Sequence, residues 1–328
     1  MTDKHPPGLS RWSEALSVLG PFLGLLFVTA LFSLSDELRP VFYTGASWKN
    51  ILTQTVIVAT GALGMTLIIV SGGIDLSVGS VVALSGVVGA RMLEHEVPVG
   101  WTILATLSVG ALVGLINGSI IAGFRMLPFV VTLGMMGIAR GLAKWLADNQ
   151  TVNVEGDSII VRLMERQSTD TFLPLPHGVW ITVVLTLALA VVLRSSVFGR
   201  HVFAIGSNEA TARLCGIPVR WRKVSIYALA GVFFGLAGLM QLSRLTQGDP
   251  SVAVGLELDI IAAVVIGVAS LSGGTGSMMG SVIGALIMAV LRSGSSQMNW
   301  PNYVQEIIIG VVIILAVGLD RLRQKTRD

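Results

Sequence analysis

The polar residues of greatest chemical interest lie in residues 71–80, a glycine-rich stretch that carries one acid, Asp75, inside a long apolar tract. The tract runs from residue 51 to residue 90. As one helix it would be roughly 60 Å long, about twice the hydrocarbon thickness that one bilayer crossing requires. The glycines therefore predict a break in the helix. A carboxylate there is a candidate functional group, because non-helical backbone at membrane depth must face protein or a water-filled cavity.

Polar side chains within or at the ends of apolar segments are candidates for contact with a transported solute. There are five of them: Asp75, Ser77, Asn117, Thr132 and Asp259. Such hydrogen-bonding groups suit a solute that carries hydroxyl groups. Two of them also have structural alternatives. Asp75 could cap the following helix by accepting from the N–H groups of Ser77 and Val78, and Asn117 could join neighbouring helices.

No residue pattern in the chain indicates catalysis or a cofactor. Cys215 is the single cysteine, which excludes an internal disulfide and a cysteine metal cluster. The four histidines are far apart in the sequence, and no paired carboxylates or nucleophile arrangement lies inside the apolar segments. The phosphate-binding pattern G-x-x-x-x-G-K-[ST] is also missing. We therefore predict no catalytic residue, no metal and no cofactor, and an ATP-driven step would require another subunit.

The composition indicates the class of protein. Of the 328 residues, 53% are hydrophobic and 12% are charged, about half the charged fraction of a soluble protein. This predicts an all-α polytopic membrane protein with about ten transmembrane helices. They are expected over residues 15–34, 51–70, 76–93, 101–124, 126–146, 178–194, 224–243, 257–271, 276–292 and 304–320. The 38 glycines suit close packing between such helices.

Basic residues indicate how the chain is oriented. If the N-terminus is cytoplasmic, thirteen of the 22 basic residues and six of the 19 acids fall on the cytoplasmic side. This bias predicts that both termini are cytoplasmic, which an even number of spans permits. It also explains the pI of about 9.3 without nucleic-acid binding. The predicted organisation is a cytoplasmic tail (1–14), one transmembrane domain (15–320) and a basic cytoplasmic tail (321–328).

The cytoplasmic loop 194–223 is predicted to contain a short surface helix. Asn208 can cap this helix, Glu209 lies in its first turn and Arg213 lies near its end. Gly216 and Pro218 follow as stop signals. A capped helix within a basic loop suggests a docking element for a partner protein.

The opposite side of the membrane receives a segment over residues 147–178 that is rich in acids. These are Asp148, Glu155, Asp157, Glu165 and Asp170. The segment is either a solvated connector or a docking surface. Arg140 and Lys144, near the end of the preceding span, are expected to extend toward the membrane interface, with Asp148 as a possible partner.

A short sequence also repeats in the two halves of the chain. Ser71-Gly72-Gly73 and Ser272-Gly273-Gly274 each follow a span that is expected to run from outside to inside. Glycine-broken segments in corresponding positions of two halves point to a transport pathway, and chance repetition in a glycine-rich chain is the alternative.

Four segments in order resemble the ribose-type permeases of bacterial ATP-binding-cassette importers. They are residues 61–80, which end in Ser-Gly-Gly-Ile-Asp-Leu-Ser-Val-Gly-Ser, residues 127–141, residues 199–217 and residues 257–274. The resemblance covers roughly residues 15–320. Departures from the family pattern at Val268 and Thr275 leave the particular solute open.

The resemblance implies a fold like that of the type II importers and a place in the bacterial inner membrane. It implies import of a small polar solute, such as a monosaccharide, by two permease chains, a cytoplasmic ATPase and a periplasmic binding protein. The residues that would contact the ATPase are Gly206, Asn208, Glu209, Ala210, Ala212, Arg213, Gly216 and Ile217. The alternatives are an ion-gradient-driven secondary carrier, or a permease of the same class for a nucleoside, a signalling furanone or a branched amino acid.

Overall fold

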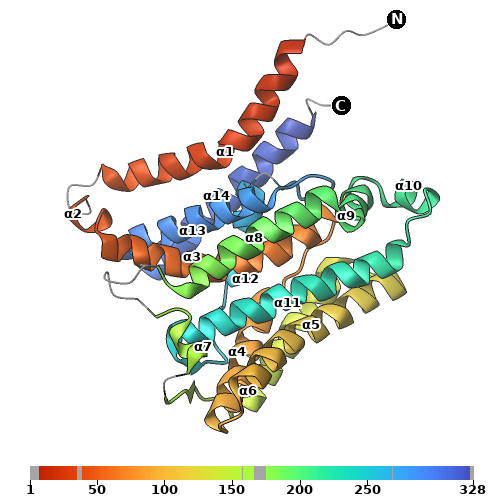
Figure 1. The fold of residues 1–328 in the computed structure, drawn as a ribbon. Helices are drawn as coiled ribbons and strands as arrows, with labels where there is room; N and C mark the ends of the chain where they lie inside the picture. The colour runs from red at the N-terminus through yellow and green to blue at the C-terminus, as the bar shows by residue number, and fades with distance from the viewer. Residues whose placement is uncertain (1–6, 35–38, 157, 166–174, 268, 326–328) are drawn as a thin grey trace, which may run out of the picture.

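The computed structural model of the chain describes residues 7–34, 39–156, 158–165, 175–267 and 269–325 (Figure 1). Almost all of its regular structure is helical. The elements are α1 (Pro7–Ser33), α2 (Arg39–Phe42), α3 (Gly45–Val70), α4 (Val78–Glu94), α5 (Val99–Phe124), α6 (Pro128–Leu146), β1 (Val152–Asn153), α7 (Ile159–Arg162), α8 (His177–Ser195), α9 (Val197–Ser207), α10 (Glu209–Leu214), α11 (Val219–Leu245), β2 (Gln247–Gly248), α12 (Leu256–Ile266), α13 (Met278–Gln297) and α14 (Asn302–Lys325).

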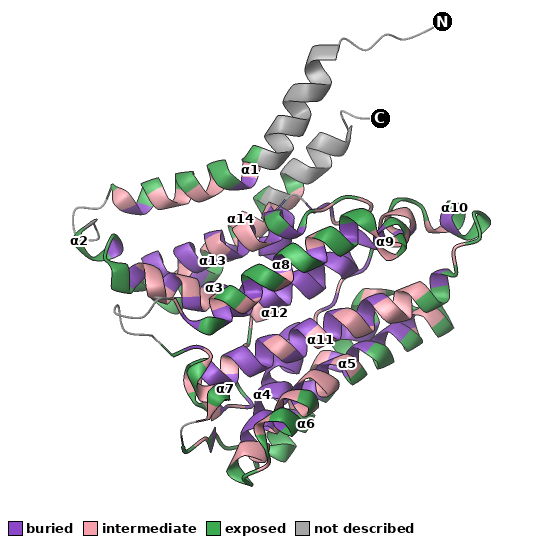
Figure 2. Ribbon diagram, in the orientation of Figure 1, coloured by how far each residue is buried: buried purple, intermediate pink, exposed green. Residues whose placement is uncertain are grey.

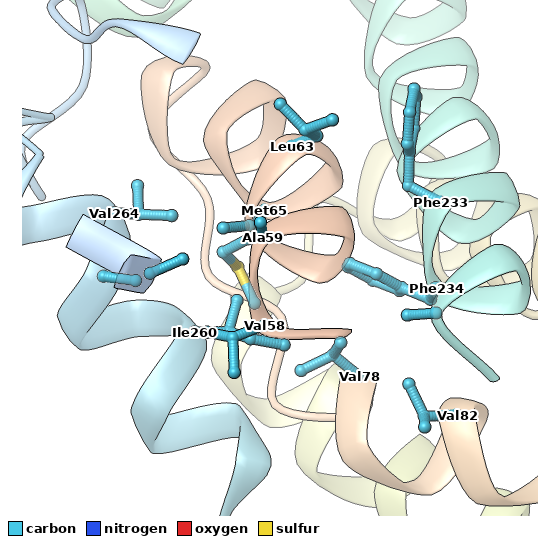
Figure 3. Close-up of a cluster of buried hydrophobic side chains, with 14 of the residues drawn as sticks. Val58, Ala59, Leu63, Met65, Val78, Val82, Phe233, Phe234, Ile260 and Val264 are labelled. Carbon is cyan, nitrogen blue, oxygen red and sulfur yellow. The ribbon is translucent and has the colours of Figure 1, made fainter. Parts of the chain in front are cut away.

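Helix α3 forms the centre of the helical bundle. Every residue from 56 to 70 is buried, and the helix carries no charged residue over that length. A helix that is apolar on all sides is stable only where neighbours cover it. In Figure 3, Val58 and Met65 of α3 lie between Ile260 of α12 and Phe234 of α11, with Val78 of α4 below. The core therefore lies where α3, α4, α11 and α12 meet.

The outer helices are equally apolar but only partly buried. Exposed residues run along the outward faces of α5, α6 and α8 (Figure 2). They include Leu112 and Ile116 on α5 and Val184 on α8. Within the described residues, six helices are long and apolar enough to cross a membrane. Apolar outer faces of this kind require a lipid environment, so the chain is an all-α, multi-pass membrane protein.

Helices α5 and α11 show why the chain is rich in glycine. A Cβ atom on Gly110 would lie 2.7 Å from the backbone nitrogen of Gly235 and would overlap the carbonyl of Gly231. One turn further, a Cβ atom on Gly114 would overlap the backbone of Tyr227. Only glycine allows two helix backbones to approach so closely. The prediction that glycines support close helix packing is confirmed at this crossing.

Each of the ten predicted spans contains a helix, but several boundaries differ. The range 257–271 is helical only over α12, which is about 16 Å long and too short to cross a bilayer alone. The loop 194–223 is largely helical, because a second helix, α9, precedes the predicted short helix. Helix α1 begins inside the predicted tail 1–14, and α14 continues into the predicted tail 321–328.

The acidic segment over residues 147–178 is partly tied to the bundle. Strand β1 pairs antiparallel with β2, which places Val152 opposite Gly248. The hydroxyl of Ser243 on α11 accepts from the Met164 N–H and donates to the carbonyl of Val161. A freely solvated connector is therefore wrong for this part of the segment. Asp157 and Asp170 lie outside the described residues.

Candidate functional site

Residues 71–77 connect α3 to α4 and contain Asp75. A Cβ atom on Gly61, in the middle of α3, would lie 3.8 Å from Val78. Helix α4 therefore starts beside the middle of α3, and the connecting residues run back along α3 into the bundle. The segment thus begins at the end of α3 and reaches the level of the middle of that helix. Its backbone lies at depth among protein, as non-helical membrane segments require.

Asp75 stabilises this connection. One carboxylate oxygen accepts from the Ser77 N–H at 2.7 Å and from the Ser77 hydroxyl at 2.6 Å. The predicted bond to the Ser77 N–H is confirmed, but Ser77 itself occupies the N-cap position of α4. Asp75 is only 1% exposed. Its carboxylate therefore fixes the conformation of Leu76 and Ser77, the two residues that lead into α4.

Asn117 and Thr132 hold the same connection from two other helices. The amide of Asn117 on α5 donates to the second carboxylate oxygen of Asp75 at 3.3 Å and lies 3.2 Å from the hydroxyl of Ser77. The hydroxyl of Thr132 on α6 accepts from the Leu76 N–H at 3.1 Å. The prediction that Asn117 joins helices is confirmed. Four of the five predicted pathway residues thus form one network, and both oxygens of Asp75 are engaged within it.

The two repeated glycine turns meet each other and the end of α9. The Gly274 N–H donates to the carbonyl of Val70 at 2.8 Å, which joins the α12–α13 turn to the last residue of α3. A Cβ atom on Gly273 would lie 3.0 Å from the Cα of Gly72. A Cβ atom on Gly206 of α9 would lie 2.6 Å from the Gly274 nitrogen and would overlap the Val70 carbonyl. We call this contact among Val70, Gly72, Gly206, Gly273 and Gly274 the glycine junction.

The short helix predicted after Asn208 is present as α10. The side-chain oxygen of Asn208 accepts from the Thr211 N–H at 2.9 Å, as an N-cap does. Gly216, with φ +81°, ends the helix in the left-handed conformation that favours glycine. Ala212 is buried against Ile205 of α9, so α9 and α10 form one packed unit.

Glu209 holds α10 to the start of α11. Its carboxylate pairs with Arg213 at 3.0 Å and with Lys223 at 2.5 Å. Burial of the carboxyl opposes ionisation, but the hydrogen bond and charge of Lys223, together with Arg213, outweigh it and lower the pKa of Glu209. Two large apolar side chains are nevertheless exposed here: Leu214 at the end of α10 is 88% exposed, and Trp221 in the first turn of α11 is 72% exposed.

Asp259, the fifth predicted pathway residue, lies apart from the Asp75 network. It is buried in the first turn of α12, and one carboxylate oxygen pairs with Arg292 of α13 at 2.6 Å. The other oxygen, Oδ1, has no hydrogen-bond partner among the described residues. Asp259 lines a cavity of about 230 Å³. The cavity is bounded by Gln54, Ile57, Val58, Gln241, Arg244, Ala253, Val254, Leu256, Asp259, Met288, Ala289 and Arg292.

The segment that leads into α12 also runs through the bundle. Gly248 packs on Ala90 in the last turns of α4, whereas the carbonyl of Ala253 packs on Gly79 in its first turn. Residues 249–255 therefore run along α4 outside any helix, with one turn hydrogen bond from the Val252 N–H to the Asp249 carbonyl. Arg140 of α6 satisfies this backbone by donating to the carbonyls of Pro250 and Val252 at 2.8 and 2.7 Å.

This arrangement corrects the prediction for Arg140, whose side chain binds backbone within the bundle and does not extend to the interface. Asp148, the suggested partner of Arg140 and Lys144, pairs with Arg91 of α4 at 2.7 Å. No group of three or more His, Cys, Asp or Glu side chains that could hold a metal is found in the part of the chain that the structure describes. Sequence reasoning missed both Arg292 and the cavity, because their positions depend on how α3, α11 and α13 pack.

Comparison with known proteins identifies the class. Residues 47–317 match the family model described as the permease component of the branched-chain amino acid transport system. The chain belongs to this permease family. No significant match to a solved structure is found.

Curated relatives agree with this family assignment. The chain is 39% identical over 300 residues to the ribose import permease protein of Escherichia coli strain K12, covering 92% of this chain and 93% of that protein. It is 39% identical over 311 residues to the ribose import permease protein of Bacillus subtilis strain 168, covering 95% of each chain. An L-arabinose permease protein of Azospirillum brasilense is 35% identical over 303 residues, covering 90% of this chain and 86% of that protein.

Proposed function

We propose that the chain is the membrane subunit of an ATP-binding-cassette importer that carries a monosaccharide from the periplasm to the cytoplasm across the bacterial inner membrane. Its relatives named for ribose and L-arabinose support the solute class. The single observation that carries the mechanism is the glycine junction, where the α9–α10 unit contacts both breaks in the central helices.

The proposed topology has ten crossings with both termini in the cytoplasm. Six helices are long enough alone, and α1, α4 and α14 would supply three more. The last crossing combines α12 with the non-helical residues on either side of it. In Figure 1 the first turn of α1 and the last turn of α14 lie near each other above the bundle, and α10 lies at its right-hand edge. The bias of basic residues supports a cytoplasmic location for both termini and for α10.

The α9–α10 unit is the proposed contact with a separate ATPase. The exposed side chains Leu214 and Trp221 would enter a cleft of that subunit, since exposed aromatic and apolar groups in an otherwise basic loop provide anchors. Asn208 and Gly216 fix the shape of the helix, and Glu209 fixes its position on α11. Of the ATPase-contact residues predicted from the sequence, these three would therefore act by shaping the unit.

Closure of the ATPase would then move the unit as a rigid body. Gly206 packs directly on the backbone of both glycine turns, so a shift of α9 must displace the end of α3 or the α12–α13 turn. Packed interfaces of this kind transmit small displacements because backbone atoms cannot interpenetrate. A second permease chain would complete the pore, and a periplasmic binding protein would deliver the solute.

An ion-gradient-driven carrier is the alternative from another class. It would need an ionisable group at depth that gains and loses its ion during transport. Asp75 does not suit that role because both of its oxygens are bonded to neighbouring residues. Within the importer class, nucleosides, a signalling furanone and branched amino acids are the alternative solutes.

Reconstitution into liposomes tests the proposal. The chain would be co-purified with the proposed ATPase and binding protein, and uptake of labelled D-ribose and L-arabinose would be measured with internal or external ATP. We expect uptake of one sugar that depends on ATP on the ATPase side and persists when ionophores remove ion gradients. Uptake that follows the proton gradient, or a chain that does not associate with the ATPase, would contradict the proposal.

Leu214→Glu gives a matched test of the docking surface. We expect it to reduce ATP-dependent uptake at least tenfold and to release the ATPase during purification. The control is Ile159→Glu, which places the same charge at an exposed apolar residue of α7 on the opposite side of the bundle. Equal uptake by the two variants would remove α10 from the interface.

A further inference from the structure

The cavity beside Asp259 has features of a binding site. The proposed function was argued without this cavity. Its base is formed by the start of α12, and its walls are formed by α3, α11 and α13. Arg244, in the last turn of α11, is exposed, so the cavity reaches the surface at that end. In the proposed topology this end faces the periplasm.

The side chain of Asp259 carries the strongest indication of a missing ligand. Its Oδ2 is bound by Arg292, whereas its Oδ1 is buried and has no partner among the described residues. A buried acceptor without a hydrogen bond is costly, so native proteins rarely retain one. Because Asp259 also lines the cavity, a donor placed in that cavity could supply the bond.

We propose that this cavity is a solute site that binds a neutral, monosaccharide-sized polyol. Asp259 would accept from a hydroxyl group, while the amides of Gln54 and Gln241 would each donate to and accept from others. The inference rests on the proposed function and extends it by assigning the solute site. It also separates Asp259 from the other predicted pathway residues, which maintain the connection between α3 and α4.

Charge favours a neutral ligand over an ionic one. Arg292 already neutralises Asp259, and Arg244 adds a positive charge at the mouth, which disfavours a cation. An anionic group offers only hydrogen-bond acceptors, so it would leave the Oδ1 of Asp259 without a donor. A zwitterionic amino acid would need an unpaired acid to bind its ammonium group. Asp259 is the acid among the lining residues, and it is already paired with Arg292.

Size and polarity agree with a small solute. The cavity of about 230 Å³ is smaller than the roughly 300–1,000 Å³ of drug-sized ligand sites. At about 30 Å³ per water molecule it has room for a handful of waters or for one small sugar. Apolar side chains on one wall, Ile57, Val58 and Met288, would contact the carbon face of such a ring.

Thiol labelling tests the site directly, because the chain has one cysteine. In a Cys215→Ser background, Gln54→Cys and Gln241→Cys would be labelled from the periplasmic side with a membrane-impermeant maleimide. The complex would be reconstituted with its ATPase and binding protein, and D-ribose or L-arabinose would be added at tens of millimolar. We expect the sugar that the background complex imports to slow labelling at both positions at least threefold.

The control is Gln150→Cys, because Gln150 is exposed on the outer connector and does not line the cavity. Its labelling should not respond to sugar. If the background complex imports a sugar but that sugar does not slow labelling at positions 54 and 241, the solute site is wrong and the proposed function stands. Protection by sodium gluconate or by leucine instead would overturn the neutral-polyol assignment. A background complex that imports neither sugar with ATP would count against the proposed function itself.

Discussion

Asp75 and Asp259 are both buried carboxylates in an apolar bundle, yet their surroundings differ. Asp75 receives hydrogen bonds on both oxygens from neutral groups of Ser77 and Asn117. Asp259 receives one charged partner, Arg292, and keeps its other oxygen unbonded beside a cavity. A saturated carboxylate holds the protein together, whereas a half-satisfied one beside a cavity can bind something else.

The comparison reverses the order that the sequence suggested. Asp75 interrupts the longest apolar tract and so stands out as a candidate site, while Asp259 follows Glu257 at the start of a predicted span. Burial does not separate them, because both are nearly inaccessible. What separates them is the number of hydrogen bonds that each carboxylate already accepts, and that number depends on tertiary packing.

The largest expected effect comes from Arg292→Met. It leaves the Asp259 carboxylate buried without its cation, which typically costs about 3–5 kcal/mol. We expect a large fall in melting temperature of the purified chain. Adding Asp259→Ala to the same chain removes the remaining charge and should restore much of the stability, but uptake should stay low because the side-chain acceptor is lost. A double variant that imports at the wild-type rate would show that Asp259 is merely structural.

Asp75→Ala is expected to have the next largest effect. It removes the acceptor for the Ser77 N–H and for the Asn117 amide, and each buried donor left unsatisfied costs about 1–3 kcal/mol. We expect a lower melting temperature and poor accumulation in the membrane. Asp75→Asn keeps an oxygen for the Ser77 N–H and should recover both stability and uptake. Full stability with abolished uptake in Asp75→Asn would make Asp75 a transport residue and break the contrast with Asp259.

The sequence was sufficient for features that depend on local signals. Hydrophobic runs predicted a helix in each of the ten ranges, and Asn208 and Gly216 predicted α10 through capping rules. Features that depend on contacts between distant segments could not be predicted in this way. Arg140 looked like an interfacial residue from its position near a span end, but it binds carbonyls of residues that follow α11.

The repeated glycine turns fall between these cases. Their similarity suggested a common role, and the structure brings them into contact with each other. Nothing in the sequence indicated that Gly206 would also lie in the glycine junction, because a glycine within a short amphipathic helix is tolerated for many reasons. Only the approach of its backbone to Val70 and Gly274 explains why a side chain cannot fit there.

Gly206→Ala tests whether α9 is coupled to the two glycine turns. One turn leads into the segment that contains Asp75, and the other follows α12, which carries Asp259. The added methyl group would overlap the Val70 carbonyl, and overpacking of this kind costs about 1–3 kcal/mol. We expect ATP-dependent uptake to fall several-fold, with a moderate loss of stability. Gly137→Ala is the matched control, since it is also a helical glycine and nothing lies within 4 Å of its Cβ position. Equal uptake by these two variants would remove the glycine junction from the coupling route.

The smallest expected effect concerns Glu209, an exposed counterpart to the two buried acids. Its folded-state pKa is lowered, so the pair with Lys223 stabilises the protein at neutral pH. This contribution is lost as the pH falls below about 4.3 and passes through the folded-state pKa. With the Glu209 side chain 40% exposed, we expect less than about 1 kcal/mol. Glu209→Gln should therefore lower the melting temperature slightly at pH 7, and the difference from wild type should shrink on acidification. Glu155→Gln, on the outer connector, should show no such difference at either pH. If the lower melting temperature of Glu209→Gln persisted unchanged in acid, the Glu209 side chain would act through packing and not through its charge.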